Sequence, residues 1–152
     1  MCMAMYLYTE KTLEEIEWNN NDPKMFIENL TLKKERGEDI GSDIGAFNWN
    51  DNNRKVYYIG SSQGCGCGWG SDSYDEVDMN NEDEKNEFED RIKDRNDLYK
   101  LLKSEDFNES YIIVCWEGEQ WKELIKTVKL NIEKIKNVEY EFNKLVKYIL
   151  YD

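Results

Sequence analysis

Four cysteines are the residues of this chain whose type and spacing point most directly to chemistry. They are Cys2, Cys65, Cys67 and Cys115. Thiolate sulfur is a ligand for zinc and for iron–sulfur centres. The chain contains no histidine, which excludes Ser-His-Asp triads, Cys-His pairs and zinc sites that need imidazole. We therefore ask whether the fold can bring the four thiols together.

A topological argument predicts that it does. Residues 56–59 (VYYI) and 111–116 (YIIVCW) are β-branched and aromatic runs that predict buried strands. A helix is predicted between them over 82–104, and such βαβ crossovers join parallel strands. The loop after the first strand then emerges on the sheet edge where the second strand ends. If the strand predicted over residues 2–8 runs antiparallel to either one, its start lies on the same edge.

This edge would carry a cysteine-lined site formed by Cys2, Cys65, Cys67 and Cys115, with zinc or an iron–sulfur centre as the predicted cofactor. Residues 60–70 hold five of the nine glycines, which allows the backbone to fold tightly around a metal. The ligand-binding residues predicted around this site are Gly64, Gly66, Gly68, Trp69 and Trp116.

Two other interpretations of the cysteines stay open. The spacing is C-x-C and not the C-x2-C common in structural zinc sites, so Cys2 and Cys115 are alternatively small core residues of buried strands. A thiol enzyme using Cys2 or the Cys65/Cys67 pair is the other alternative; removal of the initiator Met would give Cys2 a free amine as base. The N-terminal residues do not resemble a secretion signal, so lasting disulfides are not expected.

The segments YYIGSSQGCGCGWG and YIIVCWEG, together with the Met-Cys start, resemble a small bacterial family of uncharacterised proteins. In that family a strand ends in a Gly-Ser-x-x-Gly-Cys-Gly-Cys-Gly-aromatic loop, and a later Val-Cys-Trp strand is followed by acidic residues. The matching positions cover about a quarter of this chain. The family has no assigned function, so the resemblance implies that the cysteine loop is its centre and implies no use for it. The matching residues are Cys2, Tyr57, Tyr58, Gly60, Ser61, Gly64, Cys65, Gly66, Cys67, Gly68, Trp69, Val114, Cys115 and Trp116.

The remaining patterns predict a single α+β domain over residues 1–152, with a mixed sheet of about five or six strands and one or two short helices besides the helix at 82–104. Asn81 is the predicted N-cap of that helix. Residues 33–53 look irregular. Residues 121–138 fit either a strand followed by a short helix, which we favour, or one long helix. A final strand is expected near 145–150.

The charge limits the possible partners. The chain of 152 residues carries 33 acidic and 20 basic side chains, a net charge of -13. This charge opposes direct binding to nucleic acid and to anionic lipid, and no apolar run approaches the length of a membrane span. We expect a small acidic cytoplasmic binding or accessory protein, whose partner, if it is a protein, has a basic surface. The oligomeric state is left open.

The most acidic segment is 72–90, with ten carboxylates and one lysine. A solvated surface is the simplest interpretation, because the segment lacks the ligand pattern of an EF-hand. An acidic inhibitor is an alternative function, since carboxylates at phosphate-like spacing can occupy a basic nucleic-acid-binding site, as a DNA mimic does.

Overall fold

The computed structural model describes residues 2–51 and 53–152. Met1 of the Met-Cys start, and residue 52 of the segment expected to be irregular, lie outside the described residues. The described part of the chain contains six strands, two α-helices and three 3-10 helices. The elements are β1 (Met3–Thr9), β2 (Phe26–Asn29), α1 (Leu30–Glu35), η1 (Gly41–Trp49), β3 (Lys55–Gly60), η2 (Gly66–Trp69), α2 (Glu82–Ser104), β4 (Tyr111–Trp116), β5 (Lys126–Asn131), η3 (Ile132–Lys134) and β6 (Val146–Tyr151).

The strands form one mixed sheet in the order β2-β3-β1-β4-β6-β5. Every neighbouring pair is antiparallel except β5 and β6, which are parallel. β3 and β4 both run antiparallel to β1, so they are parallel to each other, with β1 between them. The predicted α+β class and the predicted parallel relation of β3 and β4 are confirmed. β1 runs antiparallel to both, which is the orientation on which the convergence of the cysteines depends.

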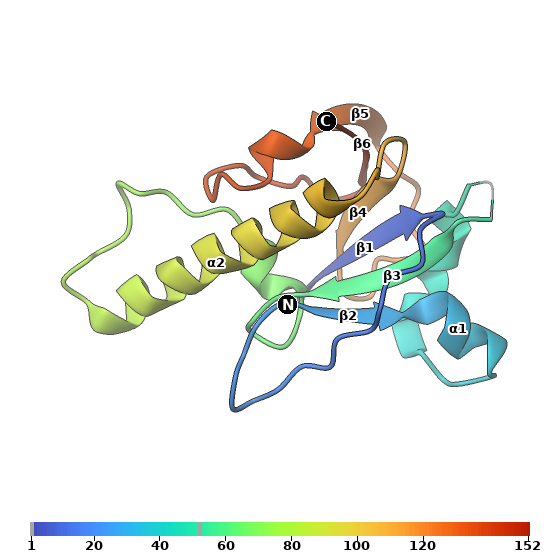
Figure 1. Ribbon diagram of the computed structural model, residues 1–152, viewed down its shortest axis with the longest axis horizontal. Helices are drawn as coiled ribbons and strands as arrows, with labels where there is room; N and C mark the ends of the chain where they lie inside the picture. Colours follow the sequence, from blue (N-terminus) through green and yellow to red (C-terminus); the bar gives the residue numbers. More distant parts are fainter. Residues whose placement is uncertain (1, 52) are drawn as a thin grey trace.

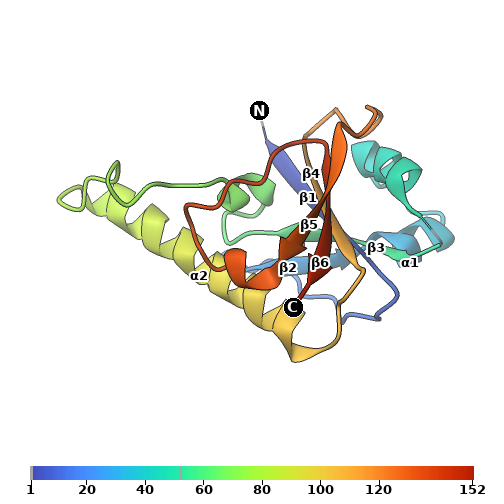
Figure 2. The same cartoon turned by 90° about the horizontal axis from the view of Figure 1, so that it is seen from above.

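The long helix occupies the predicted residues. Asn81 caps it by accepting hydrogen bonds from the backbone N–H groups of Asp83 and Glu84. Its first half and the preceding loop extend beyond the sheet, and its second half lies across one face (Figures 1 and 2). No helix of the described residues is both long and apolar enough to cross a bilayer.

Two segments test the local expectations. Residues 121–138 form β5 followed by η3, whose cap is Asn131; the long-helix alternative is wrong, because Val128 and Leu130 lie on a strand paired with β6. Residues 33–53 are less irregular than expected, since they include the end of α1 and all of η1. The nine residues of η1 form a 3-10 helix, which has three residues per turn. Its sequence therefore does not show the 3.6-residue periodicity by which an α-helix is recognised.

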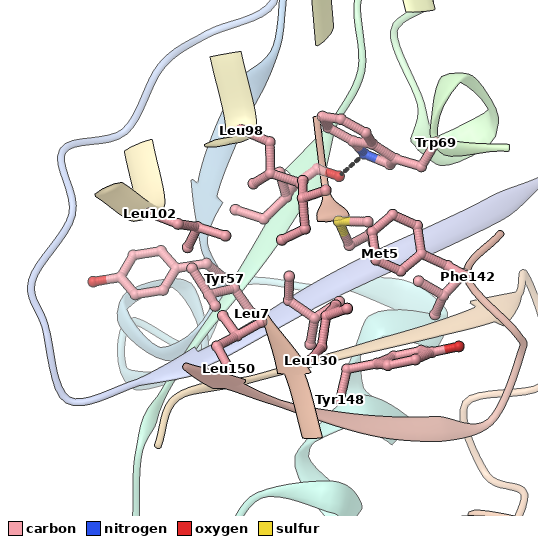
Figure 3. Close-up of a cluster of buried hydrophobic side chains, with 14 of the residues drawn as sticks. Met5, Leu7, Tyr57, Trp69, Leu98, Leu102, Leu130, Phe142, Tyr148 and Leu150 are labelled. Atoms are coloured by element: carbon pink, nitrogen blue, oxygen red, sulfur yellow. Dashed lines mark hydrogen bonds between the residues drawn. The ribbon is translucent and has the colours of Figure 1, made fainter. Parts of the chain in front are cut away.

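Hydrophobic clusters lie on both faces of the sheet, because β1 is buried along its whole length and alternates its side chains between them. Met5 and Leu7 face α2, where the ring of Trp69 completes the cluster shown in Figure 3. Tyr6 and Tyr8 face the side of α1 and η1. The sheet is therefore packed on both faces. Its central strands β1 and β3 position the segments that carry Cys2, Cys65 and Cys67.

Candidate metal centre

Three of the four cysteines meet at one edge of the sheet. Cys2 directly precedes β1, while Cys65 and Cys67 lie in residues 60–70, here called the cysteine loop. Their Sγ atoms all lie within 4.8 Å of one another, close enough for all three to hold one metal ion. Cys2 is exposed and the other two are half-buried. In Figure 1 the start of β1 lies beside the segment that contains η2. The predicted convergence of these three thiols is confirmed.

Cys115 does not join this group. It pairs with Ala4 across β1 and β4, and both side chains belong to the hydrophobic cluster on the side of α1 and η1. Its side chain is 0% exposed, and burial raises the pKa of its thiol to about 12. Cys115 therefore fits the alternative interpretation, a small apolar core residue.

A buried carboxylate holds the start of the cysteine loop. Ser62 donates its backbone N–H to both carboxylate oxygens of Asp94, at 3.1 and 3.2 Å, and its hydroxyl to Oδ2 at 2.7 Å. Asp94 lies on α2 and is 1% exposed. Burial raises the pKa of Asp94 to about 6 although the Ser62 hydrogen bonds favour the charged form. The loop is thus attached to the helix that joins β3 to β4.

Ser61 closes the loop on itself. Its hydroxyl donates to the carbonyl of Cys65 at 2.7 Å and accepts the N–H of Gly68 at 3.1 Å. Its backbone N–H also donates to the Cys65 carbonyl, at 2.8 Å. These bonds satisfy backbone groups that the tight turn would otherwise leave unpaired, and they orient the two loop cysteines toward Cys2.

Close backbone approach explains the predicted glycines. A Cβ on Gly66 would lie 2.3 Å from the carbonyl oxygen of Met3, so only glycine lets η2 reach β1. Gly64 has a φ of +85° and lies beneath the ring of Trp18. The Trp18 indole N–H donates to the carbonyl of Ser62 at 3.1 Å, so this side chain covers the loop from outside.

The three thiols ionise unequally. Burial is the largest cause that raises the pKa of Cys65 to about 11. Burial also opposes ionisation of Cys67, but hydrogen bonds from the Cys65 thiol, the backbone of Met3 and the Cys2 thiol outweigh it, so the pKa of Cys67 is lowered. The hydrogen bond that Cys2 makes to Cys67 raises the pKa of Cys2. Cys67 therefore has the lowest pKa of the three thiols and is the one that ionises most readily.

The two predicted tryptophans lie in different surroundings. Trp69 is 0% exposed, and its indole N–H donates to the carbonyl of Ile59 at 2.8 Å (Figure 3); the ring is part of the core and not the wall of a pocket. Trp116 is half-buried, with the ammonium of Lys144 4.5 Å from its ring centre.

Sequence reasoning missed the residues that hold the loop from behind. Arg95 is fully buried and donates to four backbone carbonyls, those of Trp69, Ile135, Asn137 and Tyr140. A signal for Arg95 was present, because it falls three residues before Leu98 and seven after Phe88, on the apolar face of α2. Asp94 carried the same kind of signal, because it falls four residues before Leu98 on that face, whereas Trp18 offered none.

Comparison with protein-family models, with curated proteins and with solved structures found no match. The interpretation of the site therefore depends on its own geometry.

Proposed function

We propose that this is a small acidic binding protein of the cytoplasm that holds one metal ion through Cys2, Cys65 and Cys67. The observation that carries the proposal is the convergence of three thiols from two segments some sixty residues apart, all within 4.8 Å of one another. Core packing does not account for it, because none of the three is fully buried. The four cysteines are free thiols, as expected of a protein in a reducing compartment.

Zinc is the metal that this donor set favours over an iron–sulfur cluster. Iron–sulfur clusters are usually held by four cysteines, and the fourth cysteine of this chain lies in the core on the α1 and η1 side. Zinc accepts three protein ligands when its fourth position is left to another molecule.

Zinc titration of the reduced, chelator-treated protein tests the proposal, with native mass spectrometry to count the ions. We expect one zinc per chain. In Cys65→Ser and Cys67→Ser, zinc affinity should fall more than the roughly 10–100-fold that follows loss of a residue outside the ligand shell. Cys115→Ala is the matched control and should bind zinc as the native chain does. Failure of the native protein to bind zinc would refute the proposal.

A second candidate function rests on the acidic segment. Residues 82–87 at the start of α2 are all exposed, and this half of the helix extends beyond the sheet (Figure 1). Such a surface fits the alternative of an acidic inhibitor that covers a basic protein site. Binding to a basic nucleic-acid-binding protein at low salt, lost when Glu82, Asp83, Glu84 and Glu87 are changed to Gln or Asn, would support it. Equal binding by that variant would contradict it.

A further inference from the structure

The cysteine cluster supplies three ligands to a metal that takes four. Zinc bound to sulfur is almost always tetrahedral. The chain has no histidine, and in residues 2–51 and 53–152 the group of mutually close ligand atoms contains three cysteines and no carboxylate. Resting on the proposed function, the geometry leaves one coordination position for a ligand from outside the chain.

That position is accessible. Cys2 is exposed, and Cys65 and Cys67 are half-buried, so none of the three residues is enclosed in the core. A structural zinc site is closed by four protein ligands, whereas a site with three protein ligands and an open position receives another molecule. The cluster has the second arrangement.

A cavity of about 550 Å³ lies beside the cysteine loop. Gly64, next to Cys65 in the chain, lines it. Glu117 also lines it, and the Glu117 backbone N–H donates to the carbonyl of Cys2 at 2.7 Å. The cavity is therefore bordered by the cysteine loop at Gly64 and by a residue that is hydrogen-bonded to the chain at Cys2. The three cysteines themselves lie beside its lining and are not part of it.

The lining of this cavity selects for positive charge. Five carboxylates and one ammonium group line it: Glu15, Glu17, Glu28, Asp43, Glu117 and Lys33. The ammonium of Lys33 is 3.7 Å from the carboxylate of Glu28 and offsets only that charge. Trp18, Phe26 and Tyr58 add aromatic rings, which attract quaternary ammonium groups through their faces.

We propose that the metal-loaded cluster takes, as its fourth ligand, the sulfur of an external thiol that carries a positive charge. The sulfur completes a four-sulfur set of the kind that zinc commonly has, and the cationic group lies in the acidic cavity. The thiol binds as a thiolate and releases its proton to the buffer. No electron is transferred, and the metal keeps its oxidation state.

Cobalt(II) in place of zinc provides the test, because its visible absorption bands report the ligand set. Three thiols of one length would be titrated into the cobalt-loaded protein: thiocholine (cationic), 2-mercaptoethanol (neutral) and 2-mercaptoethanesulfonate (anionic). Each dissociation constant is calculated from the concentration of the thiolate form, because the three thiols have different pKa values. We expect each to shift the bands, with thiocholine binding about tenfold more tightly than the sulfonate, a ratio that several weak surface charge interactions produce together. This ratio should fall toward one in about 0.5 M salt.

Variants separate the parts of the proposal. Glu117→Gln should lower the preference for thiocholine and leave the affinity for 2-mercaptoethanol unchanged. Cys115→Ala should leave the spectra unchanged. Cobalt bands that do not respond to any thiol, or a metal-linked dimer detected by light scattering, would overturn this inference while the metal-binding function stands. Equal affinities for the three thiols would overturn the charge preference. A native chain that binds neither cobalt nor zinc would refute the proposed function itself.

Discussion

At the residue scale, the cysteine cluster depends on a glycine position that has no room for a side chain. Gly66 lies so close to the carbonyl of Met3 that a Cβ would overlap it. This contact joins the cysteine loop to the start of β1, the strand that carries Cys2. The position of the thiols is therefore sensitive to changes at residues that are not themselves ligands.

Gly66→Ala should separate the loop from β1. We expect it to lower the free energy of unfolding by about 2 kcal/mol, as overpacking does, and to weaken zinc binding. Gly70→Ala is the matched control in the same loop, because its Cβ would meet no atom closer than 3.4 Å. Urea unfolding and zinc titration measure both effects. Equal zinc affinity in the two variants would contradict this account of the loop.

The raised pKa of the buried Asp94 carboxyl leads to a second prediction at this scale. Burial raises its pKa from 3.8 to about 6, so between these values the folded protein binds more protons than the unfolded chain. Its contribution to stability is complete below about pH 4 and is lost as the pH rises through 6. The free energy of unfolding of the native protein, minus that of Asp94→Asn, should fall by about 2–3 kcal/mol between about pH 4 and pH 7. Denaturant unfolding across this range measures it, and a difference that is constant with pH would exclude it.

At the scale of elements, α2 does more than cover the sheet. Its Asp94 holds the start of the cysteine loop, and its Arg95 holds the end of that loop and the segment 135–140. Burial lowers the pKa of Arg95 to about 10, so the guanidinium remains charged at neutral pH. Adjacent residues of α2 thus fix the cysteine loop beyond Gly60 and the segment 135–140, neither of which is part of the sheet.

Replacing Arg95 tests this function of the helix. Arg95→Met keeps an unbranched stem in the core but removes the guanidinium and leaves four carbonyls without their donor, at a cost of at least about 3 kcal/mol in the free energy of unfolding. Hydrogen exchange should rise in residues 66–70 and 135–140 before it rises in the sheet. Arg91→Met is the control, because the Arg91 guanidinium contacts one carbonyl at 3.5 Å and the exposed side chain of Glu87. Comparable losses in both variants would contradict the prediction.

At the scale of the whole molecule, the net charge of -13 acts on stability through self-repulsion. Residues 121–152 carry seven lysines and five acids, so the excess of negative charge resides in the rest of the chain. The folded state brings these like charges closer together than the unfolded chain does.

Salt should therefore stabilise the protein. Raising sodium chloride from about 0.02 to 0.5 M at pH 7 should increase the free energy of unfolding by about 1 kcal/mol, because the Debye length shortens from tens of ångströms to a few. The same experiment near the isoelectric point of about 4.5 is the control, and there the increase should disappear. An equal increase at both pH values would indicate a specific ion effect and not screening.

Much of the fold was predictable from local patterns. The runs at 56–59 and 111–116 and the helix at 82–104 were placed correctly because burial on both strand faces, and on one helix face, leaves a direct trace in residue type. The residue types of η1 show no such pattern, so this 3-10 helix was not predicted. The meeting of Cys2 with Cys65 and Cys67 depends on strand direction, since direction decides which sheet edge each chain end reaches. The antiparallel direction of β1 was a condition of that prediction and not a result of it.

The sequence by itself thus determined the α+β class, the parallel direction of the strands at 56–59 and 111–116, and the sheet edge that the cysteine loop reaches. The antiparallel direction of β1, which brings Cys2 to that edge, came from the tertiary structure. Tertiary structure alone decided that Cys115 belongs to the core, because a sheet edge says where a strand ends but not which face a given side chain takes. It also decided that Asp94, Arg95 and Trp18 hold the cysteine loop, and that an acidic cavity lies beside that loop. These arrangements join segments far apart in the chain, whose packing no local pattern records.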